Sequence, residues 1–302
     1  MRAAVLVSLA AGASAWSCNG HMTVAQIALD SGIMSANTIA AVNELVSLLA
    51  PTYPATGATF QEIACWADDI RSKEPATAGW HFVDFPVCRL AVKADCTQPS
   101  ENNNVVWAID TAEAELEASA TAQQEKARQV RFLVHFVGDL HQPLHASTYF
   151  SSQFPPPSGD RGGNSWRIAG AAPATELHAL WDEGLGQWAS QFRRPMNASG
   201  FAWVAALSSK VRNLYPASSL GPEIAETNVT AWAVESHAFA ESFVYTAPQA
   251  PAKISAEYIA TGQGIVLKQL AIAGYRLASA LEFIHTSPAD AVWQRVLAPA
   301  SE

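Results

Sequence analysis

The sequence predicts an all-α fold in a single domain, and three observations support this prediction. Apolar residues recur mostly at spacings of three and four, which is the period of one helix face. The chain has 302 residues, 49% of them hydrophobic, so it can bury a substantial core. No stretch has the composition of a linker and no internal repeat is evident, whereas alternation typical of a strand is confined to short pieces such as 81–85.

The expected helices follow one another along most of the chain. The stretch from Ile27 to Leu49 contains two helical patterns that Gly32 separates, and Pro51 ends the second. Further helices are expected over 105–116, 130–140, 176–192, 199–213, 223–245 and 254–285. The Pro- and Gly-rich segment 153–164 cannot be helical, so it is expected to form either a flexible excursion or one wall of a site.

Residues 1–15 have the features of a secretory signal peptide: a basic start, a short apolar stretch and an A-x-A cleavage signal. The mature domain is then 16–302. The apolar stretch is too short to span a bilayer, and no later window offers about 20 uncharged apolar residues. We therefore expect a secreted protein, or a vacuolar one, without membrane contact. Asn197 and Asn228 lie in glycosylation sequons, which suits this route. Nothing indicates a protein partner, so a monomer is expected.

An oxidising compartment makes two disulfides the expected state of the cysteines, because their number is even. The chain has four, at Cys18, Cys65, Cys88 and Cys96, and three pairings are possible. Cys88 and Cys96 enclose a short loop and are expected to pair with each other, which leaves Cys18 with Cys65. The alternative is four buried free thiols.

The charge of the chain excludes one class of nucleic-acid binding. Lys and Arg number 18 against 27 for Asp and Glu, a formal net charge of -9. No basic face can therefore hold a phosphate backbone by counterion release. If phosphate is a ligand, something other than surface lysines must attract it.

Two His-x-x-x-Asp pairs indicate metal binding. His135 and Asp139 are four residues apart, so on a helix they project from one face, as two ligands of one metal require. His178 and Asp182 repeat this spacing. The alternative for one such pair alone is an ion pair on a helix surface. His141 lies off the first face and is expected either to support the ligands or to lie at the surface.

Three shorter stretches add candidate ligands. One carries adjacent carboxylates beside a tryptophan (66–71), and another places His and Asp three apart (80–84). Signal cleavage would also create a free α-amine at Trp16, which can bind a metal once it has lost its proton. Alone, each stretch has an ordinary explanation: Asp69 is expected to be a solvated surface charge, and His81 could be a hydrogen-bonded core histidine.

Together these motifs resemble those of the zinc-dependent S1/P1 nucleases, which are related in fold to bacterial zinc phospholipases C. The motifs W-x4-H, W-A-D-x-x-R, W-H-x-x-D, H-F-x-G-D-x-x-Q-P-L-H, G-G-N and H-x-x-W-D occur in this order from residue 16 onwards. The resemblance implies a mainly helical domain with three zinc ions in a cleft. The implied ligands are Asp68, His81, His135 and Asp139 for one zinc, Trp16, His21 and a shared Asp139 for its neighbour, and His145, His178 and Asp182 for the third.

The resemblance also implies an activity. It is hydrolysis of single-stranded RNA and DNA to 5'-phosphates, together with removal of phosphate from 3'-nucleotides. Arg71 is expected to stabilise the phosphate and Asp84 to orient the attacking water, roles that suit a guanidinium and a carboxylate. Phe82 is expected to stack on a base, and Asn164 to bind substrate or orient a ligand. The alternatives are a mutual salt bridge or an ordinary loop charge for Arg71 and Asp84, and a core position for Phe82.

Two other functions compete with a nuclease. The first is a zinc phospholipase C, but the aspartate at Asp182 and the short W-x4-H spacing argue against that branch. The second is a non-catalytic secreted protein in which zinc is a structural staple. A staple predicts fully ligated sites, whereas the second and third implied sites need water or substrate to complete their ligand shells.

Overall fold

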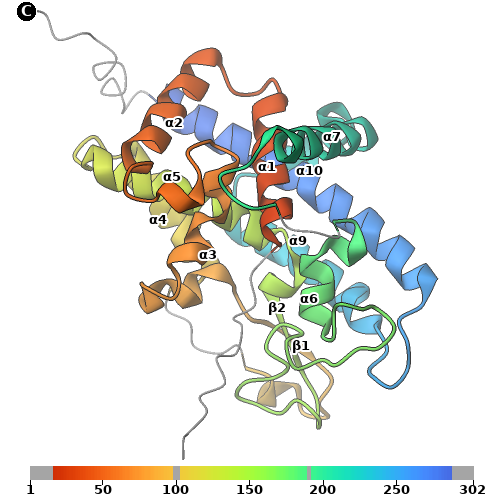
Figure 1. The fold of residues 1–302 in the computed structure, drawn as a ribbon. Helices are drawn as coiled ribbons and strands as arrows, with labels where there is room; N and C mark the ends of the chain where they lie inside the picture. The colour runs from red at the N-terminus through yellow and green to blue at the C-terminus, as the bar shows by residue number, and fades with distance from the viewer. Residues whose placement is uncertain (1–15, 98–102, 189–191, 288–302) are drawn as a thin grey trace, which may run out of the picture.

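The computed structural model of the chain describes residues 16–97, 103–188 and 192–287, and this part is a mainly helical domain (Figure 1). The prediction of an all-α single domain is therefore confirmed. The proposed signal peptide, 1–15, lies outside the described residues. In chain order the helices and strands are α1 (Cys18–Asp30), α2 (Ala36–Leu49), α3 (Trp66–Ile70), β1 (Phe85–Cys88), α4 (Val105–Glu117), α5 (Gln123–Leu140), β2 (Ser147–Phe150), α6 (Leu177–Asp182), α7 (Ala198–Leu214), α8 (Gly221–Ala225), α9 (Val229–Ser242) and α10 (Ala256–Thr286).

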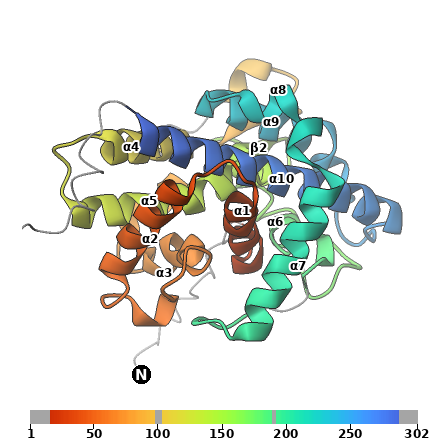
Figure 2. The ribbon, with the colours of Figure 1, turned by 90° about the horizontal axis from the view of Figure 1, so that it is seen from above.

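Helix α5 is the centre of the fold. From Val130 to Leu140 every residue of this helix is buried, so the rest of the protein surrounds this part of the helix on all sides. Helices α1, α2, α4 and α10 all contact it, and α10 also packs across α1 (Figure 2). A helix buried all round is typical of a core rather than of a surface. Polar residues on α5 are therefore held in the interior, where they need partners.

Two of the expected helices are shorter than the apolar pattern suggested. Within the described part of the stretch 176–192, the α-helix is confined to α6, because Gly184 and Leu185, two and three residues after its end, take left-handed backbone angles of φ +56° and +53° in a short 3-10 turn. The stretch 223–245 is divided into α8 and α9. Asn228 begins the second of these by accepting a hydrogen bond from the Ala231 N–H (3.0 Å). Local backbone geometry thus interrupts a hydrophobic period that continues in the sequence.

A two-stranded parallel sheet joins two segments that are distant in sequence. β1 pairs with β2 in a register that sets Phe85 opposite Ser147. The strand expected from residue 81 begins only at Phe85, since His81 ends a 3-10 helix. Beyond the strand, the Val83 N–H donates to the His145 carbonyl (2.8 Å), which extends the pairing toward the interior. The sheet therefore places His81 beside His145.

The disulfide pairing expected from the sequence is confirmed. Cys18 is bonded to Cys65, and Cys88 to Cys96. The first bond links α1 to the segment that leads into α3, and the second closes a surface loop after β1. Over the described residues, none of the helices is both long and apolar enough to cross a membrane.

Candidate metal centre

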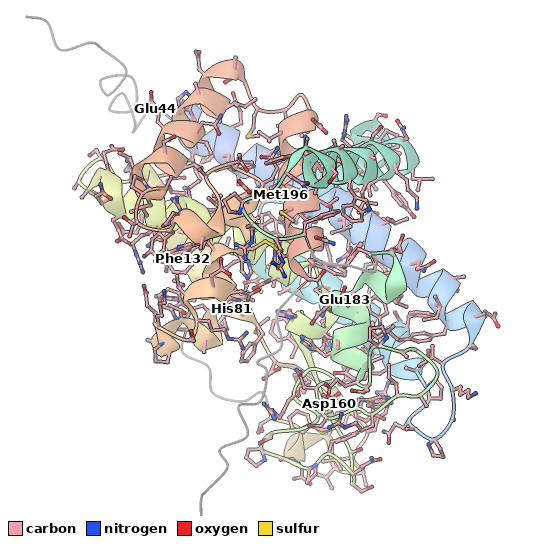
Figure 3. The ribbon with its side chains drawn as sticks, in the orientation of Figure 1. Glu44, His81, Phe132, Asp160, Glu183 and Met196 are labelled. Atoms are coloured by element: carbon pink, nitrogen blue, oxygen red, sulfur yellow. A yellow bond between two sulfur atoms is a disulfide. The ribbon has the colours of Figure 1, made fainter. Side chains whose placement is uncertain are left out.

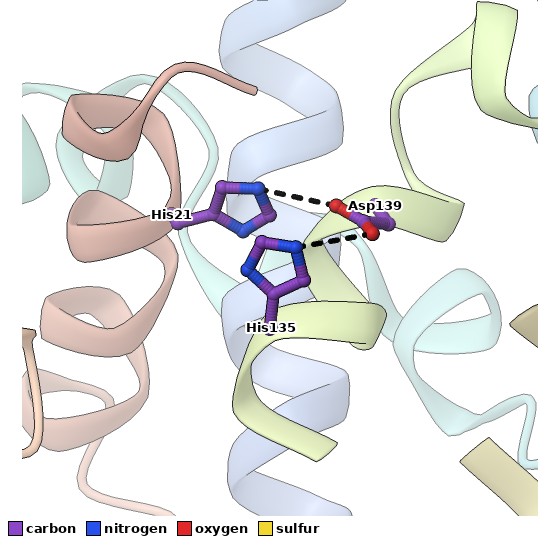
Figure 4. A group of neighbouring side chains, drawn as sticks. All are labelled: His21, His135 and Asp139. Carbon is purple, nitrogen blue, oxygen red and sulfur yellow. Dashed lines mark ion pairs between the residues drawn. The ribbon is translucent and has the colours of Figure 1, made fainter. Parts of the chain in front are cut away.

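The first group of candidate ligands forms where α1 meets α5. His135 and Asp139 lie one turn apart on α5, with His135 Nε2 3.2 Å from Asp139 Oδ2. His21 approaches from α1, and its Nε2 lies 3.1 Å from Asp139 Oδ1 (Figure 4). The His21 and His135 rings stack with centroids 4.0 Å apart. Gly138 permits this approach, because a Cβ at that position would lie 2.6 Å from His21 Nδ1.

The charges in this group are strongly coupled. Burial, helped by the neighbouring His135, lowers the pKa of His21 to about 4, so its imidazole is neutral near pH 7. Burial also opposes the charge of His135, but the carboxylates of Asp139 and Asp68 raise its pKa to about 9. The pKa of Asp139 lies well below its usual range despite burial, because His135 faces it. The carboxylate is thus available as an anion between two imidazoles.

A second group shares His135 with the first. Asp68 comes from α3 and His81 from the end of the 3-10 helix, near the middle of the molecule (Figure 3). His81 Nδ1 lies 2.9 Å from Asp139 Oδ2 and 3.1 Å from His135 Nε2. Asp68 Oδ1 lies 3.8 Å from His81 Nδ1. Because His135 and Asp139 contact both groups, the two groups form one continuous cluster of nitrogen and oxygen donors.

The third group is held by the short 3-10 helix Pro143–Ala146, which follows α5, and by α6. His145 Nε2 and His178 Nε2 lie 3.1 Å apart, and Asp182 Oδ2 is 3.4 Å from His178 Nε2. Gln142 Nε2 donates to Asp182 Oδ1 (2.8 Å), and both side chains are buried. Gln142 was not among the candidates from sequence, although it stands inside the richest histidine motif.

The third group has the donor set that a metal ion needs. His145 Nδ1 lies 2.7 Å from the His81 carbonyl, and His178 Nδ1 lies 2.5 Å from the Gly162 carbonyl, so each Nδ1 must carry the hydrogen. Burial lowers the pKa of His178 to about 3, so its Nε2 carries a lone pair. Two lone pairs would then face each other at 3.1 Å. A cation between them removes the repulsion, and tetrahedral zinc with bonds of about 2.0–2.1 Å sets such nitrogens about 3.4 Å apart.

The beginning of the described chain lies against this third group. The Ser17 N–H donates to the Asp182 carbonyl (2.9 Å), and Trp188 Nε1 donates to the same oxygen (3.0 Å). Trp16 is fully buried, with its ring 6.2 Å from that of Trp188. These contacts fix Trp16 near the candidate ligands of α1 and α6. Ligation by its amine and carbonyl remains a prediction.

The other candidate site residues surround the cluster. The Arg71 guanidinium is 3.8 Å from Asp68 Oδ1 and is 24% exposed, so it borders the cluster and reaches solvent. Phe82 and Asp84 are half-buried on the segment between His81 and β1. Asn164 Nδ2 donates to the Arg161 carbonyl (2.8 Å) within the glycine-rich loop. The roles of these four residues remain predictions.

One expectation about residues near the cluster is corrected, and one of two alternatives is excluded. Asp69 is partly exposed but is not a solvated surface charge, because Arg194 binds both of its oxygens at 2.6 and 2.8 Å. For His141 the surface alternative is excluded: the side chain is fully buried, its Nδ1 bonds the Val137 carbonyl, and Arg276 lies 3.0 Å from its Nε2. The segment 153–164, for which two alternatives were open, forms a wall of the third group through Gly162.

Over the described residues, the mainly helical domain gathers three groups of His and Asp donors in its interior, an arrangement consistent with metal sites. The model of the S1/P1 Nuclease family matches residues 16–286. The chain therefore belongs to this family and is a phosphodiester hydrolase, which confirms the resemblance seen in the motifs.

Proteins similar to this chain are also named as nucleases or endonucleases. It is 28% identical to Endonuclease 4 of Arabidopsis thaliana over 301 residues, covering 95% of this chain and 94% of that protein. It is 26% identical to Nuclease P1 of Penicillium citrinum over 288 residues (90% and 98%). Nuclease S1 of Aspergillus oryzae (strain ATCC 42149 / RIB 40) is 24% identical over 300 residues (94% and 97%).

Proposed function

We propose that this chain is a secreted, zinc-dependent endonuclease that cuts single-stranded RNA and DNA to 5'-phosphate products and also removes phosphate from 3'-nucleotides. The observation that carries the proposal is the pair of facing Nε2 atoms of His145 and His178, 3.1 Å apart beside a buried carboxylate. Donor sets of imidazole and carboxylate without thiolate suit catalytic zinc. The names of the relatives support nuclease activity.

Three sites would hold the metal. When bound there, zinc supplies Lewis acidity toward a phosphate and toward a water molecule. The proposed ligands are Asp68, His81, His135 and Asp139 for the first site, Trp16, His21 and Asp139 for the second, and His145, His178 and Asp182 for the third.

The side chains around the cluster would bind and orient the substrate. Arg71 is exposed enough to reach a phosphate and can donate two parallel hydrogen bonds to its oxygens. Asp84 would orient the attacking water and accept its proton. Phe82 offers a half-buried ring on which an unpaired base can stack, which favours single strands over duplexes. Asn164, in the glycine-rich loop, would bind substrate or orient a ligand.

Export of the chain follows from its processing and its disulfides. Residues 1–15 would be removed as a signal peptide, and this cut creates the α-amine of Trp16 as a ligand. The two disulfides suit an oxidising compartment. A variant that retains residues ahead of Trp16 should lose most activity. Full activity of that variant would disprove the role of the amine.

The activity is tested on purified mature protein. Heat-denatured DNA, duplex DNA, RNA, 3'-AMP and phosphatidylcholine are offered with and without a zinc chelator, and the phosphate ends of the products are determined. We expect chelator-sensitive cutting of single strands with 5'-phosphate ends. His178→Ala should abolish it, whereas the matched change His285→Ala, near the end of α10, should not. Chelator-insensitive cutting, or lipid cleavage alone, would contradict the proposal.

A further inference from the structure

A buried carboxylate outside the three groups, that of Asp160, bridges two backbone segments. Its Oδ1 accepts a hydrogen bond from the N–H of Tyr149 in β2 (2.7 Å), and its Oδ2 accepts one from the N–H of Gly163 (2.9 Å). The Tyr245 hydroxyl donates to Oδ1 as well (3.1 Å). The side chain is fully buried in the lower part of the molecule (Figure 3). A buried carboxylate is costly without such donors, so its position is well determined.

One of the bridged segments follows a histidine of the third group in the chain, and the other contacts the second histidine of that group. β2 begins two residues after His145. Gly163 directly follows Gly162, whose carbonyl accepts the hydrogen of His178 Nδ1 (2.5 Å). The carboxylate of Asp160 therefore links β2, which follows His145 in the chain, to the loop whose Gly162 carbonyl contacts His178 of α6.

The glycine-rich loop has no side chains of its own at the point of contact. Gly162 and Gly163 have φ of +59° and +82°, which glycine adopts without strain. A Cβ on Gly162 would lie 2.6 Å from the Leu144 carbonyl, so the bare backbone packs directly against the residue before His145. Backbone bonds also hold the loop, among them those from the Asp160 N–H to the Tyr149 carbonyl (2.9 Å) and from the His178 N–H to the Gly163 carbonyl (3.4 Å), and the Asp160 carboxylate adds the side-chain bond to the Gly163 N–H.

We propose that Asp160 is a positioning residue of the third group. It keeps the Gly162 carbonyl against His178 Nδ1, fixes the tautomer that leaves the Nε2 lone pair facing His145, and so holds both imidazoles at metal-binding distance. The metal part of this proposal rests on the proposed function. The tautomer part concerns the zinc-free chain alone.

The test uses Asp160→Asn in the full mature chain. An amide cannot accept from both backbone N–H groups at once, because one of its two polar atoms is itself a donor. In zinc-free protein labelled with ¹⁵N-histidine, long-range proton–nitrogen spectra should show His178 as the Nδ1–H tautomer in the wild type and as a mixture in the variant. Competition with a chelator should show one of the bound zinc ions lost about 10- to 100-fold more readily than from the wild type.

Tyr245→Phe is the matched control. It removes one bond to the same carboxylate but leaves both backbone bonds, so tautomer and zinc affinity should stay as in the wild type. If Asp160→Asn does not fold, Gly163→Ala serves as the second test. A Cβ at position 163 would lie 3.2 Å from the backbone nitrogen of His178 and so displaces the same loop. An unchanged tautomer in the folded variant, or an equal loss in Tyr245→Phe, would overturn the proposal. If the wild type binds no zinc, the proposed function is refuted, and the tautomer result alone decides the proposal on Asp160.

Discussion

The Cys18–Cys65 disulfide is expected to hold the metal centre together as well as the fold. Cys18 precedes His21 by three residues, and Cys65 precedes Asp68 by three, so each half of the bond lies one turn ahead of a candidate ligand. The perturbation is the double change Cys18→Ser and Cys65→Ser. Cys88→Ser with Cys96→Ser is the matched control, because that bond closes a surface loop.

The two bonds differ in how strongly they restrict the unfolded chain. Their sequence separations are 47 and 8 residues. Loop-closure entropy then gives a stabilisation of about 4 kcal/mol for the longer loop and about 2.5 kcal/mol for the shorter one at 25 °C. Loss of the first bond should therefore destabilise the protein more, and it should also free α1 to move relative to α3.

Urea unfolding in the presence of a chelator measures the first effect, since it removes any contribution of bound metal. Zinc content after dialysis against a weak chelator measures the second. We expect the Cys18/Cys65 variant to lose more unfolding free energy than the control and to lose zinc that the control retains. If both variants keep the same zinc, the disulfide does not act on the metal centre, and equal unfolding free energies would contradict the loop-entropy argument.

Three further changes test the interior. Gln142→Leu removes the bond to Asp182 and should lower the unfolding free energy in chelator by about 1–3 kcal/mol; a urea midpoint equal to that of the wild type would contradict it. Burial and nearby carboxylates raise the pKa of Glu113 from 4.5 to about 7, so the folded state binds more protons and stability falls as pH rises through this window. Glu113→Gln should therefore be more stable than the wild type at pH 8 and equal to it at pH 4, and thermal unfolding that shows no such difference would disprove the cause. Arg194→Ala removes the bidentate ion pair with Asp69, which is partly exposed, and should lower the unfolding free energy by about 1 kcal/mol or less. A larger loss of unfolding free energy in urea would show that the pair does more than anchor α3.

The sequence predicts those parts of the site that depend on local geometry. His135 with Asp139, and His178 with Asp182, lie four residues apart, and helix geometry alone brings each pair together. The break after α6 was also visible in principle, since glycines flank Leu185, but the hydrophobic period obscured it.

Contacts between distant segments could not be predicted in this way. The bond from Gln142 to Asp182 spans 40 residues, and that from Arg194 to Asp69 spans 125. Nothing in the spacing of either residue indicates its partner, because the fold of the whole chain decides which surfaces meet. Asp160 is a similar case: its loop was recognised as non-helical, while its role depends on β2 and on Tyr245.

The net negative charge of the chain bears on how a phosphate could be attracted to it. Carboxylates of Asp68, Asp139 and Asp182 are gathered with histidines in a chain of net charge -9, so under the proposed function the attraction for phosphate would come from cations bound there. Binding of an uncleavable phosphorothioate single strand to the zinc-loaded protein should then weaken less than about tenfold between 50 and 200 mM salt, because few phosphates are neutralised by Lys or Arg. A protein that makes 6–10 such contacts loses about 10³–10⁵ over this range. A loss of that size, or binding that survives a chelator unchanged, would show that a basic surface outside the metal centre holds the strand.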